Sequence, residues 1–483
     1  MNHIEVSAFH DCRLISELDI PESVTYIGRS AFQNCNALSK IKLPFIGAAN
    51  DGDIYHRNDF FGYIFGAVSA QDQNEYVPKS LKSVEVTHGN VLPTNAFYGC
   101  ENIVSITLPD RMTQILHDAF YGCSSLTNVD IPDGVWNICG GAFSNCTSLT
   151  AIHLPDALRQ ITGQLFDGCS QLKTVAIPPN VELIGNYAFR NCISLTSITF
   201  PEKCQCIFEG AFLGCQNLET VEIQQKNFIS IDKDAFRNCS MLQEIHLPEQ
   251  MSIIKEGTFF GCSGLRKVNI PYFTTTIERE AFEGCSSLIE LLIPADVKEI
   301  EDGAFRNCSS LKSVVFASGS QLTHLNSIFE GCSSLKEVVF PYNGKLTEVY
   351  SQVFTDCKSL ESIELPYGVT FVGHDVFMGC TNLKHVTISD KVTIMGGSVF
   401  EQCVSLESIV LPKSIQRIGY RSFYNVPNSL KIYYKGTASE WMRVSVGSDR
   451  YAPFSYDVYY YSETQPTTQG NYWRYVNGVP TAW

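Results

Sequence analysis

The sequence has no long apolar run: none of its segments approaches the roughly 18 consecutive apolar residues that predict a membrane-spanning helix. Its first residues, MNHIEVSAFHDC, have neither the basic cluster nor the apolar stretch of a secretion signal. We therefore expect no membrane span and no signal peptide within this chain.

Basic residues are also scarce. Lys and Arg number 35 against 50 Asp and Glu, which gives a formal net charge of −15. Nucleic-acid binding needs a clustered excess of Lys and Arg, and the sequence has no such cluster. Hydrophobic residues make up 44% and charged residues 18%, a composition typical of packed proteins rather than of disordered chains. We expect a folded protein without a nucleic-acid partner.

The usual motifs of catalysis and metal binding are missing as well. The sequence contains no His-Glu-x-x-His, Gly-x-Ser-x-Gly or phosphate-binding glycine loop. Cys204 and Cys206 form one Cys-x-Cys pair, but no second pair or histidine follows at zinc-finger spacing. We expect no catalytic residues, no cofactor and no metal site. An enzyme with its active centre in the C-terminal segment is the least favoured hypothesis.

Cysteine, in contrast, is abundant and regularly spaced. Sixteen of the 19 cysteines recur about every 23 residues, at positions 12, 35, 100, 123, 146, 169, 192, 215, 239, 262, 285, 308, 332, 357, 380 and 403. Pro78 and Val426 fill two further slots, which makes about 18 repeats. Neither residue can form a disulfide or bind a metal, and cysteines in stacked repeats would project in parallel rather than converge. We interpret the cysteines as small core residues.

Around each slot the sequence follows the pattern A-F-x-x-C-x-x-L-x-x-[IV]-x-[IL]-P-x-x-V-x-x-I. The alternation in [IV]-x-[IL] predicts a short strand with one buried face, and the proline ends it. Apolar residues three or four apart in the rest of the unit favour turns over a full helix. A unit this short cannot bury its apolar face alone, so the copies must stack. The pattern predicts a repeat solenoid with a parallel sheet on one face and turns on the other.

The units AFEGCSSLIELLIP (281–294) and AFRNCSSLKSVVF (304–316) resemble the BspA-type leucine-rich repeat of bacterial and protist surface proteins. The resemblance extends over roughly residues 1–426. It implies a right-handed, curved leucine-rich-repeat array. By association it also implies a cell-surface or secreted protein that binds host matrix proteins or other cells.

An insert at about residues 45–77 interrupts the repeats. It contains Phe60, Phe61, Tyr63 and Phe65 within DFFGYIFGA. Loops on a rigid scaffold often carry recognition, which makes these four rings candidate binding residues. The alternative is that the rings fold back onto the sheet or the turn wall and fill the irregular repeat.

The two ends of the chain differ. The chain begins inside a repeat, with Ile4 in the slot that Ile27 holds one repeat later, and no capping segment precedes it. This start predicts a fragment of a longer product. Residues 427–483 are interpreted as an aromatic-rich capping segment after a solenoid of residues 1–426. Strands are expected in LKIYYKG and DVYYYSE, with a short helix in TASEWMRV capped by Thr437. The stretches YYKGTASEWMRVSV and GNYWRYVNGVPTAW are similar to tails that close such arrays.

The outward-facing position of the strand motif contains one anomaly. This column is otherwise mostly polar or small, but it is apolar in three consecutive repeats, at Leu292, Val315 and Val339. A contiguous exposed apolar strip often marks a partner site, and Lys312 and Lys336 would give it a polar rim. The alternatives are that aliphatic residues simply suit a parallel sheet, or that a loop covers them.

These observations favour a non-catalytic binding scaffold that mediates adhesion to proteins or glycans on a host or microbial surface. The rival hypothesis is a structural spacer or display stalk for a separate domain of a longer surface protein.

Overall fold

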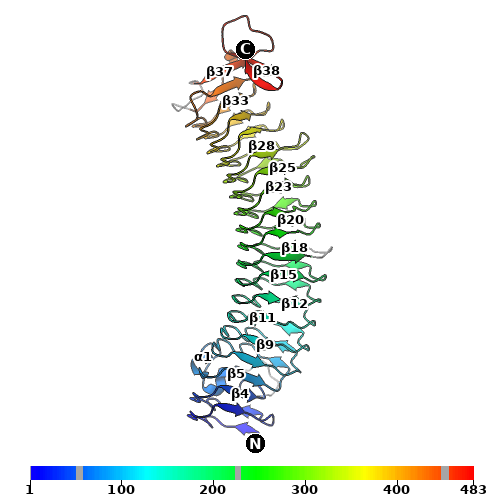
Figure 1. Cartoon of the computed structure of the whole chain (residues 1–483), viewed down its shortest axis with the longest axis vertical. Helices are drawn as coiled ribbons and strands as arrows, with labels where there is room; N and C mark the ends of the chain where they lie inside the picture. The colour runs from blue at the N-terminus through cyan, green and yellow to red at the C-terminus, as the bar shows by residue number, and fades with distance from the viewer. Residues whose placement is uncertain (1, 50–57, 224–229, 448–455) are drawn as a thin grey trace. The chain divides into compact units, whose positions relative to one another are not determined.

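The computed structural model describes residues 2–49, 58–223, 230–447 and 456–483. Over these described residues the chain forms a parallel β-solenoid of about 19 turns with almost no helix. It divides into two compact units, residues 1–242 and 243–483. Within each unit the strands form two columns, and in each column the strands of successive repeats lie side by side (Figure 1).

Each repeat places a strand at its [IV]-x-[IL] positions, as the pattern predicts. In unit 1 these strands are β2 (Glu17–Asp19), β4 (Lys40–Leu43), β5 (Ser83–Val86), β7 (Ser105–Thr107), β9 (Asn128–Asp130), β11 (Ala151–Ile152), β13 (Thr174–Val175), β15 (Ser197–Phe200) and β17 (Thr220–Ile223). In unit 2 they are β19 (Glu244–Ile245), β21 (Lys267–Val268), β23 (Glu290–Ile293), β25 (Ser313–Phe316), β27 (Glu337–Val339), β29 (Ser362–Glu364), β31 (His385–Thr387), β33 (Ser408–Leu411), β35 (Lys431–Tyr434) and β37 (Asp457–Tyr461). We call these strands the first column.

A second column of two-residue strands lies at the end of the V-x-x-I segment. In unit 1 it consists of β1 (His3–Ile4), β3 (Tyr26–Ile27), β6 (Val91–Leu92), β8 (Gln114–Ile115), β10 (Asn137–Ile138), β12 (Gln160–Ile161), β14 (Leu183–Ile184), β16 (Cys206–Ile207) and β18 (Ser230–Ile231). In unit 2 it consists of β20 (Ile253–Ile254), β22 (Thr276–Ile277), β24 (Glu299–Ile300), β26 (His324–Leu325), β28 (Glu348–Val349), β30 (Phe371–Val372), β32 (Ile394–Met395), β34 (Arg417–Ile418) and β36 (Ser445–Val446). The sequence pattern predicted only turns here, because two extended residues give too little alternation to reveal a strand.

Pairing between the repeats is parallel in both columns. Leu291 pairs with Val314 in the first column, and Ile184 pairs with Ile207 in the second. Buried files of identical side chains run beneath these ladders. In unit 1, for example, the rings of Phe97, Phe120 and Phe143 stack with centroids 5.7 and 5.0 Å apart. The stacked rings are one reason why each 23-residue unit depends on its neighbours.

The interpretation of the cysteines as core residues is confirmed, with one addition. All but Cys12, Cys139 and Cys206 are buried, and all 19 are free thiols. A buried slot thiol also donates a hydrogen bond to a phenylalanine carbonyl of the preceding repeat. Cys192 Sγ lies 3.1 Å from the Phe166 carbonyl oxygen, which also accepts the Cys169 N–H at 3.0 Å. The cysteine therefore fills the core and ties two repeats together.

The turn wall requires a left-handed backbone conformation twice in a typical repeat. The residue before the Ala-Phe pair and the residue before the cysteine both have positive φ, as at Tyr187 (φ 57°) and Asn191 (φ 59°). The position before the cysteine is usually Gly or Asn, the residues that tolerate this conformation best. This regularity is visible in the sequence, but the repeat pattern above did not include it.

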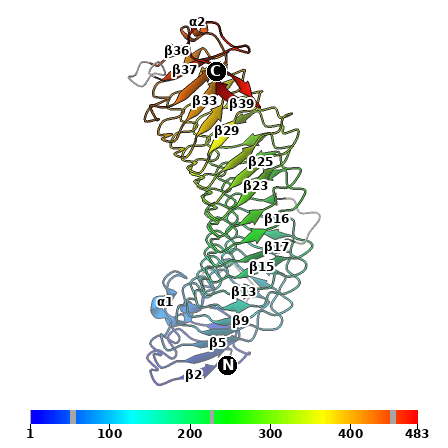
Figure 2. The same ribbon diagram turned by 45° about the horizontal axis from the view of Figure 1, so that its top comes forward.

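Residues beyond 427 extend the first column and then fold over it. The expected strands and helix are present as β35, β37 and α2 (Ala438–Trp441), and Thr437 and Glu440 form a capping box. β38 (Tyr472–Val476) and β39 (Val479–Ala482) form an antiparallel hairpin whose first strand pairs with β37 (Figure 2). The Trp473 side chain is fully buried, and its Nε1–H donates to the Tyr434 carbonyl at 2.9 Å.

Candidate functional site

The apolar strip of Leu292, Val315 and Val339 is a continuous feature of the sheet in unit 2. The three residues are direct register partners on β23, β25 and β27. Their exposed fractions are 59%, 37% and 39%. The strip therefore lies at the surface, and no described segment of the chain covers it.

The pleat of these strands explains the outward direction. On β23, Leu291 and Ile293 are buried, so Leu292 between them must point to the opposite face. Val315 is flanked in the same way by the buried Val314 and Phe316. The hydrophobic core fixes the register, and the register puts the strip in solvent.

Charged side chains surround the strip. Lys312 and Lys336, which precede β25 and β27, are exposed, and so are Glu290 and Glu337 on the strands themselves. Among the described residues, none of these four side chains takes part in an ion pair or a side-chain hydrogen bond. The strip thus has an apolar centre and a rim of both charge signs, an arrangement common in protein interfaces.

The same column becomes apolar again near the C-terminal end of unit 2, with a different result. Val410 pairs with Tyr433, and both are buried beneath Trp473, with Tyr459 packed beside them. The β38–β39 hairpin supplies this cover. Where the chain covers its own sheet, the outward column is apolar. The strip at Leu292, Val315 and Val339 has the same composition but no such cover.

In unit 1 the equivalent column is a solvated polar face. Lys42 and Glu85, which are register partners, form an ion pair at 3.2 Å. Further along the column, the Thr199 hydroxyl on β15 donates to Glu222 on β17 at 3.1 Å. This polarity separates the column of unit 1 from the strip of unit 2.

The insert corrects part of the expected site. Phe60, Phe61 and Phe65 are buried, so they do not offer a surface to a partner, and Tyr63 is half-buried. The cause is the stack of buried phenylalanine rings in the repeats, which continues through the insert. The ring centroid of Phe61 lies 5.1 Å from that of Phe97, and the ring centroid of Phe65 lies 6.5 Å from that of Phe32. The rings therefore fill the irregular repeat, which was the alternative interpretation.

Two short helical turns build the insert: the 3₁₀ helix η1 (Phe61–Phe65) and α1 (Gln73–Tyr76), which lies at the margin of the stack away from the strand arrows (Figures 1 and 2). Gln73 is fully buried and joins the insert to the next repeat. Its Oε1 accepts the Gly62 N–H at 2.8 Å, and its Nε2 donates to the Asn95 carbonyl at 3.2 Å. A Cβ on residue 62 would lie 2.2 Å from the Gln73 Cβ, which explains the glycine. Residues 50–57 of the insert lie outside the described part.

The chemistry of the thiols matches their packing. Burial raises the pKa of the Cys169 thiol to about 12, and burial likewise raises the pKa of Cys204, in the Cys-x-Cys pair, to about 12. Both thiols are therefore protonated near neutral pH, which makes them poor nucleophiles and poor metal ligands. Within residues 2–49, 58–223, 230–447 and 456–483, no group of three or more His, Cys, Asp or Glu side chains is arranged to hold a metal ion.

Sequence reasoning missed Gln73. It predicted an aromatic cap at the C-terminal end but did not identify Trp473 as the residue that covers the sheet. A buried glutamine has no sequence signal apart from its place in an aromatic insert. Trp473 lies in the recognised aromatic tail, but the residues it covers, Val410 and Tyr433, are far away in sequence. No described helix is both long enough and apolar enough to cross a membrane.

A family model described as the BspA-type leucine-rich repeat region matches residues 1–47, 90–219, 207–327 and 320–431. No curated protein matches the chain. Among solved structures, a leucine-rich-repeat protein from Bacteroides ovatus ATCC 8483 is 26% identical, over 68% of this chain and 92% of that one, with a TM-score of 0.54.

Two further solved structures are similar in sequence. The leucine-rich-repeat protein of T. pallidum is 32% identical, over 35% of this chain and 80% of that one, with a TM-score of 0.33. A leucine-rich cell surface protein from Faecalibacterium prausnitzii A2-165 is 24% identical, over 90% of this chain and 92% of that one, with a TM-score of 0.38.

Proposed function

Because this chain belongs to the BspA-type leucine-rich-repeat family, whose repeats typically form non-catalytic protein-binding scaffolds, we propose that it binds a protein partner through the sheet of unit 2. The partner docks on the strip of Leu292, Val315 and Val339. The observation that supports this site is the contrast within unit 2: the apolar stretch at Val410 and Tyr433 is covered by Trp473, whereas the strip is open.

The physical argument is the removal of apolar surface from water. Three adjacent aliphatic side chains on a rigid sheet cost little conformational entropy to bury, since their backbone is already fixed by the ladder. Burial of apolar surface contributes about 25 cal/mol per Å². The charged rim at Lys312 and Lys336 would orient the partner and limit competing contacts.

We further propose that the partner is a protein of a host or microbial surface, so that the scaffold serves adhesion at the cell surface. This step rests on the family resemblance. The rival, a spacer that displays a separate domain, needs no exposed apolar strip on its sheet, so the strip favours the adhesive function.

The test is binding of the purified chain to immobilised matrix proteins, including collagen and laminin, and to cultured host cells. The triple variant Leu292→Glu, Val315→Glu and Val339→Glu should lose at least tenfold in affinity for whichever surface the wild type binds. The matched control is His153→Glu, Ala176→Glu and Thr199→Glu, which places three consecutive carboxylates in the same column of unit 1 and should bind like the wild type. If both variants fold and bind equally well, the strip is not the docking site. Failure of the wild type to bind any of these surfaces would favour the spacer.

A further inference from the structure

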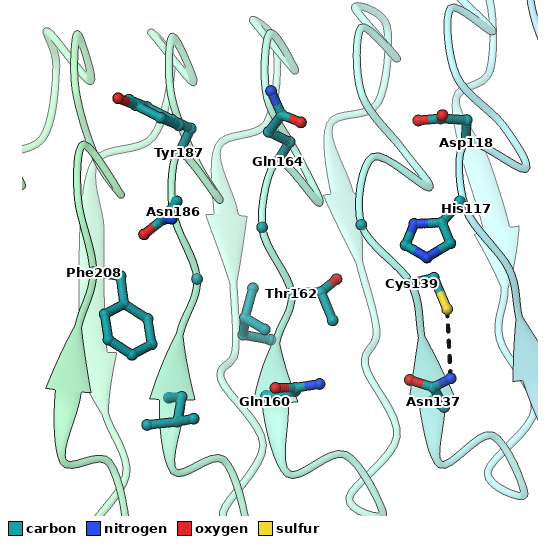
Figure 3. A pocket seen from close by; sticks show the side chains of 15 residues that line it. His117, Asp118, Asn137, Cys139, Gln160, Thr162, Gln164, Asn186, Tyr187 and Phe208 are labelled. Atoms are coloured by element: carbon teal, nitrogen blue, oxygen red, sulfur yellow. Dashed lines mark hydrogen bonds between the residues drawn. The ribbon is translucent and has the colours of Figure 1, made fainter.

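A groove of about 770 Å³ lies in unit 1 along the second strand column (Figure 3). This volume is within the range of ligand-binding pockets. Its lining comes from five consecutive repeats, in the segments 117–118, 137–140, 160–164, 183–187 and residue 208. With repeats about 4.8 Å apart, the groove extends for about 20 Å across the strands.

The strand pairing of the second column is interrupted at this groove. β10 pairs with β8, and β12 pairs with β14, but among the described strands β10 and β12 are not paired with each other. The Thr162 hydroxyl instead donates to the Ile138 carbonyl at 2.9 Å. A side chain has thus replaced a ladder contact, and the surface is hollowed where the ladder is interrupted.

The walls of the groove carry many polar side chains and almost no charge. Side-chain amides from Asn137, Gln160, Gln164 and Asn186 line it together with the Thr162 hydroxyl, and Figure 3 shows them in rows across the repeats. Each amide offers a donor and an acceptor. No side-chain hydrogen bond within the described residues uses the amides of Gln160, Gln164 or Asn186, so these groups are available to a ligand.

The charge of these walls varies along the solenoid. The three residues that follow the second-column strand are Cys-Gly-Gly (139–141), Thr-Gly-Gln (162–164) and Gly-Asn-Tyr (185–187) at the groove. The equivalent residues of unit 2 include charged ones in the segments 255–257, 278–280 and 301–303, whereas the segments 326–328, 350–352 and 396–398 are uncharged. There Lys255 and Glu278 form an ion pair at 3.2 Å. The uncharged walls are therefore not a general property of the repeat.

The ends of the groove add aromatic and acidic groups. Tyr187 and Phe208 are half-buried and lie at one end. At the other end lies Asp118, the one carboxylate in the lining, beside the exposed His117. Burial raises the pKa of the Asp118 carboxyl, with His117 acting weakly in the other direction. The lining includes neither Lys nor Arg.

We propose that this groove binds a neutral, hydroxyl-rich glycan chain that lies across the repeats. Sugar hydroxyls both donate and accept hydrogen bonds, as the amide walls do, and the half-buried Phe208 ring at one end provides a flat apolar face for a sugar ring. The Tyr187 ring lies under the Arg190 guanidinium, 5.0 Å from the ring centroid, and is not counted as such a face. Anionic ligands are disfavoured because the lining has a carboxylate and no basic side chain. A peptide anchored by apolar side chains is also disfavoured, because such a ligand needs apolar pockets and side-chain amides interrupt the apolar part of this lining. The site is separate from the strip in unit 2 and does not depend on it.

The test is affinity electrophoresis of the full chain through gels that contain one polysaccharide each. The neutral probes are mixed-linkage β-glucan, glucomannan, galactomannan, xyloglucan, arabinoxylan and soluble starch, and polygalacturonate is the anionic comparison. At least one neutral polysaccharide should retard the wild type, and the double variant Gln160→Ala with Asn186→Ala should raise the dissociation constant at least tenfold. Both side chains are exposed, so the variant should keep the wild-type circular dichroism spectrum and melting temperature.

The matched control is Gln171→Ala with Asn217→Ala, which removes two exposed amides of unit 1 outside the groove and should be retarded like the wild type. The proposal is overturned if none of the neutral polysaccharides retards the wild type, if the groove variant is retarded equally, or if only polygalacturonate retards it. Binding of an extended Asn- and Gln-rich peptide that the groove variant loses, without any glycan binding, would overturn it in favour of a peptide site. The triple variant of the strip should retain glycan binding, so the two sites can fail independently.

Discussion

At the scale of single residues, the cysteine slot has two roles that only the structure separates. The spacing of the cysteines and the substitutes Pro78 and Val426 were enough to predict packing rather than chemistry. They could not show the hydrogen bond from the thiol to the preceding repeat, because that contact depends on where the phenylalanine carbonyl of another repeat lies. The two roles can be separated by mutation.

The prediction concerns Cys192, whose Sγ donates to the Phe166 carbonyl at 3.1 Å in a fully buried site. Cys192→Ala removes both the volume and the donor, and we expect a loss of about 2 kcal/mol in the free energy of unfolding. Cys192→Ser keeps a donor in the same position and should lose about half as much. Urea denaturation followed by circular dichroism measures both variants. Equal losses would show that the S–H donor does not contribute.

At the scale of elements, a strand could be predicted only where its alternating apolar pattern was long enough to recognise. The first column was predictable because three alternating positions recur in nearly every repeat, and the same register predicted that Leu292, Val315 and Val339 face outward. The second column has two residues per strand and no usable alternation. Burial of Phe60, Phe61 and Phe65 was not predictable, because it depends on stacking against Phe32 and Phe97 in other repeats.

The insert yields the second prediction. Gln73→Leu keeps the volume of the side chain but leaves the Gly62 N–H and the Asn95 carbonyl without this partner. The Asn95 carbonyl still accepts the Tyr98 N–H at 3.1 Å, so the Gly62 N–H is the group left unsatisfied. An unsatisfied buried group costs about 1–3 kcal/mol, so we expect a loss of about 2 kcal/mol in the free energy of unfolding. Gln71→Leu, two residues away and exposed, is the control and should change stability by less than about 0.5 kcal/mol. Thermal unfolding compares the two, and similar melting temperatures would contradict the assigned role of Gln73.

The third prediction concerns the C-terminal hairpin of β38 and β39. Trp473→Ala removes the ring that covers Val410 and Tyr433, and we expect a loss of about 3–5 kcal/mol in local stability. Amide hydrogen exchange should speed up in β33 and β35 but not in β23. Trp136→Ala, at an exposed tryptophan of unit 1, serves as the control. Unchanged exchange in β33 and β35 would mean that the hairpin does not protect the sheet.

At the scale of the whole molecule, the repeat provides a uniform frame and the departures from it carry the specific surfaces. The outward column is mostly polar in unit 1 and partly apolar in unit 2. The residues that follow the second-column strands are uncharged at 139–141, 162–164 and 185–187 but include charged ones at 255–257, 278–280 and 301–303. Because solenoid repeats contact mainly their neighbours, each such change stays local. A binding scaffold can therefore place unlike sites along one chain without a change of fold.

The most direct test of the central claim, that the strip of unit 2 is the protein-docking surface, is site-specific photo-crosslinking. A benzophenone amino acid is placed at Val315 in one variant and at His153, the outward column position of unit 1, in another. After incubation with the surface or cells that the wild type binds, irradiation should attach a protein partner at position 315 and not at position 153. Crosslinking of the same partner at 153 but not at 315, or equally at both positions, would contradict the account.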